Sequence, residues 1–341
     1  MNRPHLRFLP FVALGFILVA MSACQQKDVG SEVIVYTSVD QVFSEPILRQ
    51  FERETGIQVK PVYDVETAKT TGLVTRLAAE RERPRADVFW NSEFLQTLRL
   101  KQQGLLEASD AVAVAGLPAI SFDPERYWYG VGARARVFLV NTALVGPSDY
   151  PRSLGDLLNP KYPAGSVGIA LPIFGTSATH AAALYASQGA EKTRAFYEQI
   201  QTRGVRICDG NSTVRDLVVS GQLWFGLTDS DDALGAVKRG AHVTVIAPDQ
   251  DAQGTMIVFG TVARVRGAPH PVEAQKLIEF LLKAETEQAL IQSGCFQWSL
   301  RGVISATPMF PNGLRAMDID ADSVLRYLPL STQQLREIFV R

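Results

Sequence analysis

The sequence predicts an α/β protein with two lobes joined by extended crossing strands. Apolar runs that end in polar turns alternate with amphipathic helical segments along most of the 341 residues, a pattern typical of a largely parallel sheet covered by helices. Two long extended runs, 131–141 and 256–265, flank a middle α/β segment. A strand of such length can begin in one lobe and end in the other, so the two runs predict a hinge.

The remaining elements follow from hydrophobic periodicity. The first lobe is predicted to have strands over 32–38, 57–62 and 87–90, and helices over 45–55, 70–82 and 93–103. The middle segment is predicted to have helices over 181–187, 214–219 and 233–239. Later helices are expected over 271–292 and from residue 332. We therefore assign residues 32–136 and 258–341 to the first lobe and residues 137–257 to the second.

The N-terminus has the features of an export signal over residues 1–23. Basic residues precede an apolar stretch at 8–20, and Ser22 and Ala23 precede Cys24. This order resembles a bacterial lipobox and predicts a lipid anchor on Cys24, with residues 24–31 as a tether. The alternative is ordinary signal cleavage with an unmodified cysteine. The expected location is the periplasm, with membrane attachment through the lipid alone.

Composition excludes several classes of function. The net charge is −1, so the chain lacks the basic footprint of a nucleic-acid-binding protein. The four histidines have no metal-ligand spacing, and no nucleotide-binding or hydrolase motif is present. We expect no enzyme activity, no cofactor and no metal centre. Cys208 and Cys295 are expected to be unbridged, since a disulfide between the lobes would clamp the hinge.

An acidic cluster follows the predicted strand at 224–228. Asp229, Asp231 and Asp232 lie within four positions, where ligands of open α/β sheets bind. Carboxylates at such an edge are costly to bury unless a partner pairs with them. The alternative is a solvated turn in which Asp231 and Asp232 cap the next helix.

Polar residues also follow four other predicted strands. Two of these clusters begin helices, whose free N–H groups and dipole favour an anion. Each cluster alone is an ordinary helix cap, but together they predict a ligand site. The predicted ligand-binding residues are Thr37, Ser38, Trp90, Asn91, Thr176, Ser177, Asn211, Ser212, Asp229 and Asp231. From the sequence, Asp229→Ala is expected to weaken binding tenfold or more, with folding intact.

Six stretches resemble the family-1 extracellular solute-binding proteins, in the ferric-iron-type branch. They are VYTS at 35–38, PRADVFW at 84–90, NPKY at 159–162, FGTSATH at 174–180, DGNS at 209–212 and TDSDDA at 228–233. The resemblance implies a type II periplasmic-binding-protein fold with the ligand between the lobes. It also implies a monomer that serves the permease and ATPase subunits of an ABC importer.

One feature of that branch is missing. Ferric-binding members hold iron with an adjacent tyrosine pair, and this sequence has no Tyr-Tyr; the corresponding stretch is Leu227-Thr228-Asp229. We therefore predict a small polar solute, anionic or zwitterionic, as the ligand. Ferric iron, alone or with an accompanying anion, is the alternative. A solute sensor that presents its closed form to a membrane receptor is a third possibility.

Overall fold

The computed structural model describes residues 1, 31–64, 71–111, 117, 121–301 and 313–340. The export signal and Cys24 lie outside these residues. Residues 31–341 form one compact unit, and the fold described below is that of this unit. No helix of the described residues has the length and apolar character required to cross a membrane.

The strands form one continuous path in two half-sheets. The order is β2-β1-β3-β10-β5-β8-β6-β7, with β4 beside β10 and β9 beside β5. Neighbours are parallel at β2-β1-β3 and at β8-β6-β7, whereas β10 is antiparallel to β3 and β5, and β5 is antiparallel to β8. The strands are β1 (Glu32–Thr37), β2 (Gln58–Tyr63), β3 (Val88–Asn91), β4 (Leu106–Glu107), β5 (Tyr129–Asn141), β6 (Val167–Ala170), β7 (Arg206–Cys208), β8 (Phe225–Asp229), β9 (Val243–Ile246) and β10 (Ile257–Val265).

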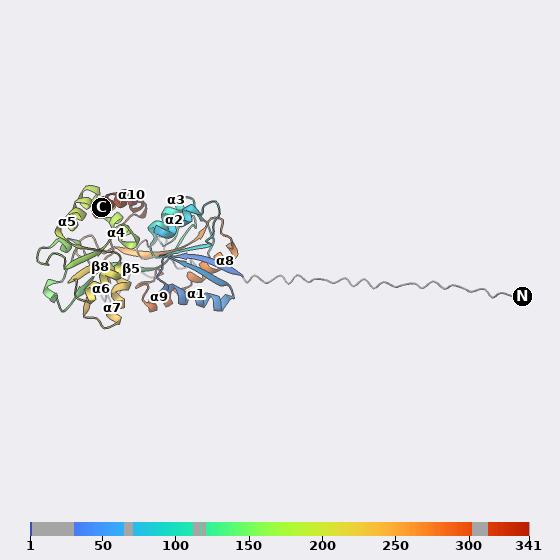
Figure 1. Cartoon of the computed structure of the whole chain (residues 1–341), viewed down its shortest axis with the longest axis horizontal. Helices are drawn as coiled ribbons and strands as arrows, with labels where there is room; N and C mark the ends of the chain where they lie inside the picture. Colours follow the sequence, from blue (N-terminus) through green and yellow to red (C-terminus); the bar gives the residue numbers. More distant parts are fainter. Residues whose placement is uncertain (2–30, 65–70, 112–116, 118–120, 302–312, 341) are drawn as a thin grey trace. The chain divides into compact units, whose positions relative to one another are not determined.

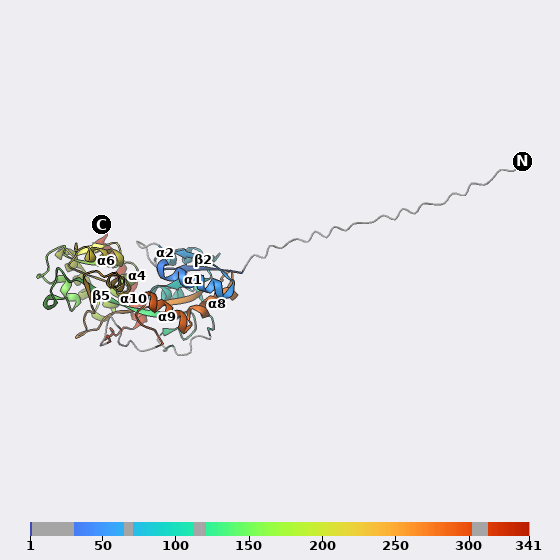
Figure 2. The same cartoon turned by 90° about the horizontal axis from the view of Figure 1, so that it is seen from below.

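Strand β5 belongs to both half-sheets. Its first part, up to Ala135, pairs with β10, and its second part, from Arg136, pairs with β8 and β9. All 13 residues are buried, which explains the long apolar run in the sequence. Figures 1 and 2 show α4 and α6 with one half of the unit, and α1 and α8 with the other. The predicted two-lobed α/β fold is confirmed, and the residue boundaries of the lobes stay a prediction.

Ten α-helices and two short 3-10 helices cover the described part of the sheet. They are α1 (Gln41–Thr55), α2 (Thr71–Ala79), α3 (Leu95–Gln102), η4 (Pro147–Asp149), η5 (Leu154–Leu158), α4 (Gly175–Gln188), α5 (Ala190–Arg203), α6 (Asn211–Val219), α7 (Ser230–Lys238), α8 (Pro271–Leu281), α9 (Ala284–Ser293) and α10 (Ala321–Phe339). Helices α4, α6 and α7 begin three to six residues earlier than hydrophobic periodicity predicts, because their first turns are small and polar.

The prediction of a single helix over 271–292 was wrong. The chain breaks between α8 and α9, and side chains satisfy carbonyls at the end of α8 that a continuing helix would use. Thr286 Oγ1 donates to the Phe280 carbonyl at 2.7 Å, and Arg301 donates to the Leu282 carbonyl. The break lets α9 pack against α1.

The predicted start of the last helix at residue 332 was also wrong. Helix α10 begins at Ala321, where the Asp320 carboxylate accepts a hydrogen bond from the Ser323 backbone N–H at 3.1 Å. The helix continues through Pro329 and packs mainly against α4 and α5. Tyr185 of α4 donates to Gln334 at 2.9 Å. Helix α10 therefore supports the helix whose first turn lies at the candidate site.

Cys208 and Cys295 are both buried and form no disulfide. Cys208 packs in the apolar cluster of α6 and α7, whereas Cys295 packs with α1 and α8. The prediction that these two residues are unbridged is confirmed.

Candidate functional site

A polar cavity of about 310 Å³ lies where the first turns of four helices meet the two half-sheets. The helices are α1, α4, α6 and α7. Ser92, which directly follows β3, and Arg134, which lies within β5, also line the cavity. The lining residues are Asp40, Gln41, Val42, Ser92, Arg134, Ala170, Leu171, Phe174, Gly175, Thr176, Ser177, Asp209, Gly210, Asn211, Ser212, Arg215, Asp229, Asp231 and Asp232.

The helix starts at this cavity have no side-chain caps. Phe174 and Gly210 occupy the N-cap positions of α4 and α6, and neither supplies a capping hydrogen bond. The first N–H groups of a helix find no acceptor within the helix, so those of α4 and α6 are available to a ligand. Their dipoles add positive potential at the same place, which favours an anion.

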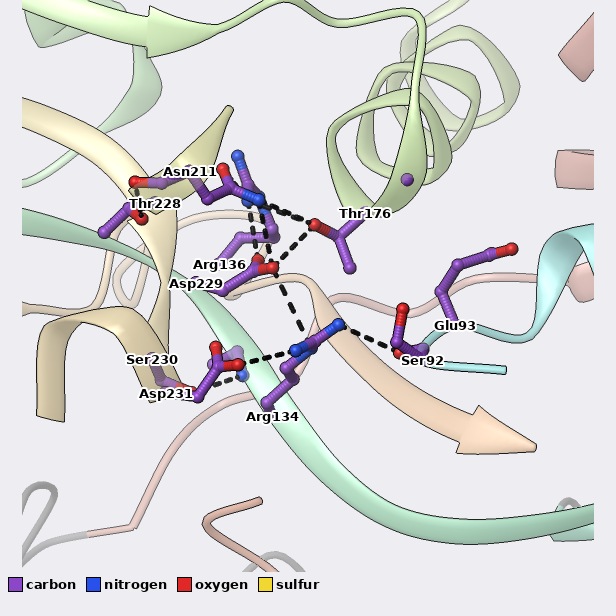
Figure 3. A network of polar contacts seen from close by, with 12 residues as sticks. Ser92, Glu93, Arg134, Arg136, Thr176, Asn211, Thr228, Asp229, Ser230 and Asp231 are labelled. Atoms are coloured by element: carbon purple, nitrogen blue, oxygen red, sulfur yellow. Dashed lines mark hydrogen bonds and ion pairs between the residues drawn. The ribbon is translucent and has the colours of Figure 1, made fainter. Parts of the chain in front are cut away.

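Two buried arginines lie beside the cavity, on the crossing strand β5. Arg134 and Arg136 alternate along the strand and therefore lie on one face. Arg136 is directly opposite Asp229 in the β5–β8 register, and its Nη1 lies 2.6 Å from Asp229 Oδ1. Arg134 Nη1 lies 2.7 Å from Asp231 Oδ2 (Figure 3). The carboxylates predicted to accept from a ligand therefore already have cationic partners within the chain.

Asp229 is the centre of a larger hydrogen-bond network. Its Oδ2 accepts from Thr176 Oγ1 at 2.7 Å and from Asn211 Nδ2 at 3.1 Å. Burial by itself would raise the pKa of Asp229, but the charges of Arg136 and Arg134 and the Thr176 hydrogen bond hold that pKa below its usual value. Arg136 Nη1 also donates to Asn211 Oδ1 at 2.9 Å. The network thus fixes the first turns of α4 and α6 relative to β5 and β8.

A second set of contacts joins α4 to the other half-sheet. Thr179 Oγ1 donates to Glu93 Oε2 at 2.7 Å. Arg134 Nη2 of β5 donates to the Ser92 carbonyl at 3.0 Å, as Figure 3 shows. Glu93 is fully buried, and burial raises its pKa above the usual value. The Leu95 backbone N–H also donates to this carboxylate at 2.6 Å. The Thr179–Glu93 and Arg134–Ser92 bonds hold the two halves together beside the cavity.

His180 is buried one turn after Thr176. Burial and the nearby charge of Arg136 lower the pKa of its imidazole to about 3, so it is neutral at physiological pH. Ser177 Oγ lies 3.5 Å from Asn211 Oδ1 rather than donating to His180. The described residues contain no group of three His, Cys, Asp or Glu side chains that could hold a metal ion.

The structure brings together six of the ten predicted site residues. They line the cavity and are Thr176, Ser177, Asn211, Ser212, Asp229 and Asp231. Asp231 and Asp232 lie in the first turn of α7, behind Asp229 at the N-cap, so they do not cap the helix as the alternative proposed.

The other four predicted residues lie outside the cavity lining. Trp90 is fully buried in an apolar core cluster, and Thr37 Oγ1 accepts from the Val39 N–H at 3.1 Å. Ser38 Oγ donates to Asn91 Oδ1 at 2.6 Å, beside the lining residue Ser92. These residues support the wall of the cavity from behind. Solute contact by any of the ten stays a prediction.

Sequence reasoning missed Arg134, Arg136 and Arg215. The signal was present for the first two: two arginines alternate inside an otherwise apolar strand, and a buried strand tolerates such charges only with partners. Arg215 lines the cavity from α6 and forms an ion pair with Asp232 at 2.8 Å.

A two-lobed α/β fold with a polar cavity at the junction of its half-sheets is typical of a protein that binds a solute. Residues 84–299 match the family of bacterial extracellular solute-binding proteins. This match covers more than half of the chain, so the protein belongs to that family.

Individual relatives differ in what their names say they bind. Iron uptake protein A1 of Synechocystis sp. is 26% identical over 284 residues, which are 80% of this chain and 77% of that protein. A putative 2-aminoethylphosphonate-binding periplasmic protein of Salmonella typhi is 25% identical over 244 residues, which are 70% of this chain and 68% of that protein. The crystal structure of apo ferric ion-binding protein A from Pasteurella haemolytica superposes with a TM-score of 0.80 at 21% identity, covering 92% of this chain and all (100%) of that one.

These findings confirm the resemblance to the ferric-iron-type branch at the level of family and fold. The protein is a solute-binding protein of the periplasmic class that serves ABC importers. Its relatives are binding proteins rather than enzymes, in line with the expectation from the sequence.

Proposed function

We propose that this protein captures a small solute with a phosphate, phosphonate or carboxylate group and delivers it to an ABC permease. The observation that carries the proposal is the convergence of the uncapped starts of α4 and α6 on one cavity. Several backbone N–H groups and two helix dipoles directed at one point recognise an anion. The solute's anionic group would lie against Thr176, Ser177, Asn211 and Ser212.

The internal ion pairs favour an anion over a bare cation. Asp229 and Asp231 are neutralised by Arg136 and Arg134 at 2.6 and 2.7 Å, so binding a ferric ion there would require those pairs to separate. Breaking a buried pair without a replacement is strongly unfavourable. Arg134 also lines the cavity and adds positive charge next to the helix starts.

The cavity also has an acidic side that suits a zwitterion. Asp40, Asp209 and Asp232 also line it; Asp232 is paired with Arg215 at 2.8 Å, whereas Asp209 is exposed. An amine or several hydroxyl groups on the solute would lie on this side. A 2-aminoethylphosphonate, a sugar phosphate or an amino acid has both ends, and the Salmonella typhi relative is named for the first of these.

Ferric iron is the second candidate, because the Synechocystis relative is named an iron uptake protein. In that case the helix starts would hold an anion that accompanies the iron. A sensor that presents its closed form to a membrane receptor is the third candidate. Permease and ATPase genes next to this one would favour the importer over the sensor.

A thermal-shift screen separates the first two candidates. Each solute class is tested beside inorganic phosphate, ferric citrate and a ferric salt. A ligand present at 100 times its dissociation constant stabilises by about 2.7 kcal/mol, which is a readily measured rise in melting temperature. We expect phosphonates, phosphates or carboxylates to stabilise the protein in the absence of iron. Stabilisation by ferric salts alone would overturn the proposal.

Ser212→Asp tests the location of the anion. Ser212 is the second residue of α6 and lines the cavity, so the substitution places a negative charge at the proposed anion site. Two like charges about 5 Å apart at an effective dielectric constant of about 20 repel by about 3 kcal/mol. We expect at least a tenfold loss of affinity with stability unchanged or raised, since an acidic residue suits a helix start.

Two control variants isolate the cause. Ser212→Asn changes the side chain without adding charge and should retain binding. Val272→Asp adds the same charge at the second residue of α8, where Val272 is 60% exposed and does not line the cavity, and should also retain binding. Equal losses in all three variants would contradict an anion site at α6.

A further inference from the structure

A second cavity, of about 300 Å³, adjoins the first. The two share lining residues, among them Val42 and Arg215. Beyond this junction the second cavity is bounded by α1, by the last turn of α7 and by the end of α9. The cleft therefore continues past the cavity in which the anionic group is proposed to bind.

The second cavity has a different chemical character from the first. Its walls include Phe43 and Leu234, which are partly exposed, and, at the junction, Val42, which is 72% exposed. Its far end has two cations, Lys238 and Arg239. Asp40, Asp231 and Asp232 line both cavities, and Asp231 and Asp232 are paired with Arg134 and Arg215. Beyond these carboxylates the second cavity offers an apolar passage that ends in positive charge.

The two cations are held at the cavity by local geometry. Lys238 Nζ reaches the Gln292 carbonyl at 3.4 Å, which keeps the ammonium group near the end of α9. A Cβ atom built on Gly235 would lie 3.3 Å from Arg239 Nη1, so this guanidinium lies over the gap left by the glycine. The Lys238 ammonium and the Arg239 guanidinium can therefore contact a ligand that extends along α7.

We propose that the solute is elongated and has two anionic groups, one in each cavity. The first group lies at the starts of α4 and α6, an alkyl segment passes Val42, Phe43 and Leu234, and a second anionic group meets Lys238 and Arg239. A phosphonate or phosphate joined to a carboxylate by a short alkyl chain has this chemistry. The inference rests on the proposed function, which supplies the first anionic group.

A homologous series of solutes tests the inference. Phosphonoacetate, 3-phosphonopropionate, 4-phosphonobutyrate and 6-phosphonohexanoate are titrated into the full chain by isothermal calorimetry, beside methylphosphonate and hexylphosphonate. Burying one methylene group raises affinity by about fourfold. We expect affinity to rise along the series, and 6-phosphonohexanoate to bind more tightly than hexylphosphonate.

Gly235 offers a matched pair of variants. It lines only the second cavity, and the one group within 4 Å of an added Cβ is the flexible end of Arg239. Gly235→Leu would fill the passage, whereas Gly235→Ala would leave most of it open. Both substitutions favour the helix, so neither is expected to unfold the protein. We expect Gly235→Leu to abolish the gain with chain length, and Gly235→Ala to retain it.

The two cations are tested separately. In Lys238→Gln/Arg239→Gln, the advantage of 6-phosphonohexanoate over hexylphosphonate should disappear, while binding of methylphosphonate is retained. Equal affinity for all chain lengths, or an equal effect of Gly235→Leu on short and long solutes, would overturn the inference and leave the proposed function standing. If no member of the series binds, the proposed function fails and the inference fails with it.

Discussion

Replacing Asp229 by alanine should destabilise the protein strongly. The carboxylate accepts hydrogen bonds from Arg136, Thr176 and Asn211, and Arg136 is only 1% exposed. Its removal leaves the Arg136 charge buried without its partner, which costs roughly 3–5 kcal/mol. This is a large fraction of the stability of a typical domain. The sequence alone predicted a loss of affinity with folding intact. The structure instead predicts that Asp229→Ala lowers the stability of the fold itself.

Urea unfolding of the apo protein, followed by circular dichroism, measures this effect. A double-mutant cycle with Arg136→Met tests the cause. When both charges are removed, no buried charge lacks a partner, so the double variant should be more stable than Asp229→Ala alone. Asp231→Asn is the matched control, because Arg134 keeps its bond to the Ser92 carbonyl and lies 3.8 Å from Asp229. Asp231→Asn should therefore lower the free energy of unfolding by less than Asp229→Ala does.

The pH dependence gives an independent check. The pKa of Asp229 is lowered in the folded protein, so its contribution to stability is present in full above its unfolded pKa of about 3.9 and is lost as pH falls through the folded value. The stability difference between wild type and Asp229→Ala should therefore be constant from pH 5 to 8 and shrink in stronger acid. A cost of less than about 1 kcal/mol at pH 7, or a double variant less stable than Asp229→Ala, would refute the reasoning.

Three further predictions concern acid stability, the N-terminus and motion. His180 has a pKa of about 3 in the folded protein and about 6.5 when unfolded, so its contribution to stability falls as pH drops from 6.5 to 3. His180→Asn should flatten that part of the pH profile of the unfolding free energy, and His242→Asn, which changes an exposed imidazole, should not. Intact-mass analysis of membrane-extracted protein should show acyl chains that Cys24→Ser removes, and recovery of only unmodified soluble protein would contradict the anchor. Small-angle scattering should show a smaller radius of gyration with bound solute, because a ligand that contacts both lobes favours the closed state; no change at saturation would count against a hinge.

The sequence alone was sufficient for the architecture. Alternating apolar runs and helical faces are local signals, and they located the strand–helix units, the 13-residue β5 and the strand β10. The small polar residues at the starts of α4 and α6 are equally local, so the sequence by itself predicts that Thr176, Ser177, Asn211 and Ser212 lie at one site. Helix limits were less reliable. Side chains outside α8 satisfy its last carbonyls and separate it from α9, and α10 begins at the Asp320 cap, well before residue 332.

Only the tertiary structure decided how the charges of the site are used. Arg136 and Asp229 are 93 positions apart and become neighbours through the register of β5 and β8, which no local pattern specifies. The same limit explains Trp90, which lies near the end of strand β3 as a site residue would but packs in the core. The second cavity likewise arises from the approach of α7 to α1 and α9. Local periodicity determines which face of each element is buried, whereas the pairing of strands and helices determines which charges meet on the buried faces.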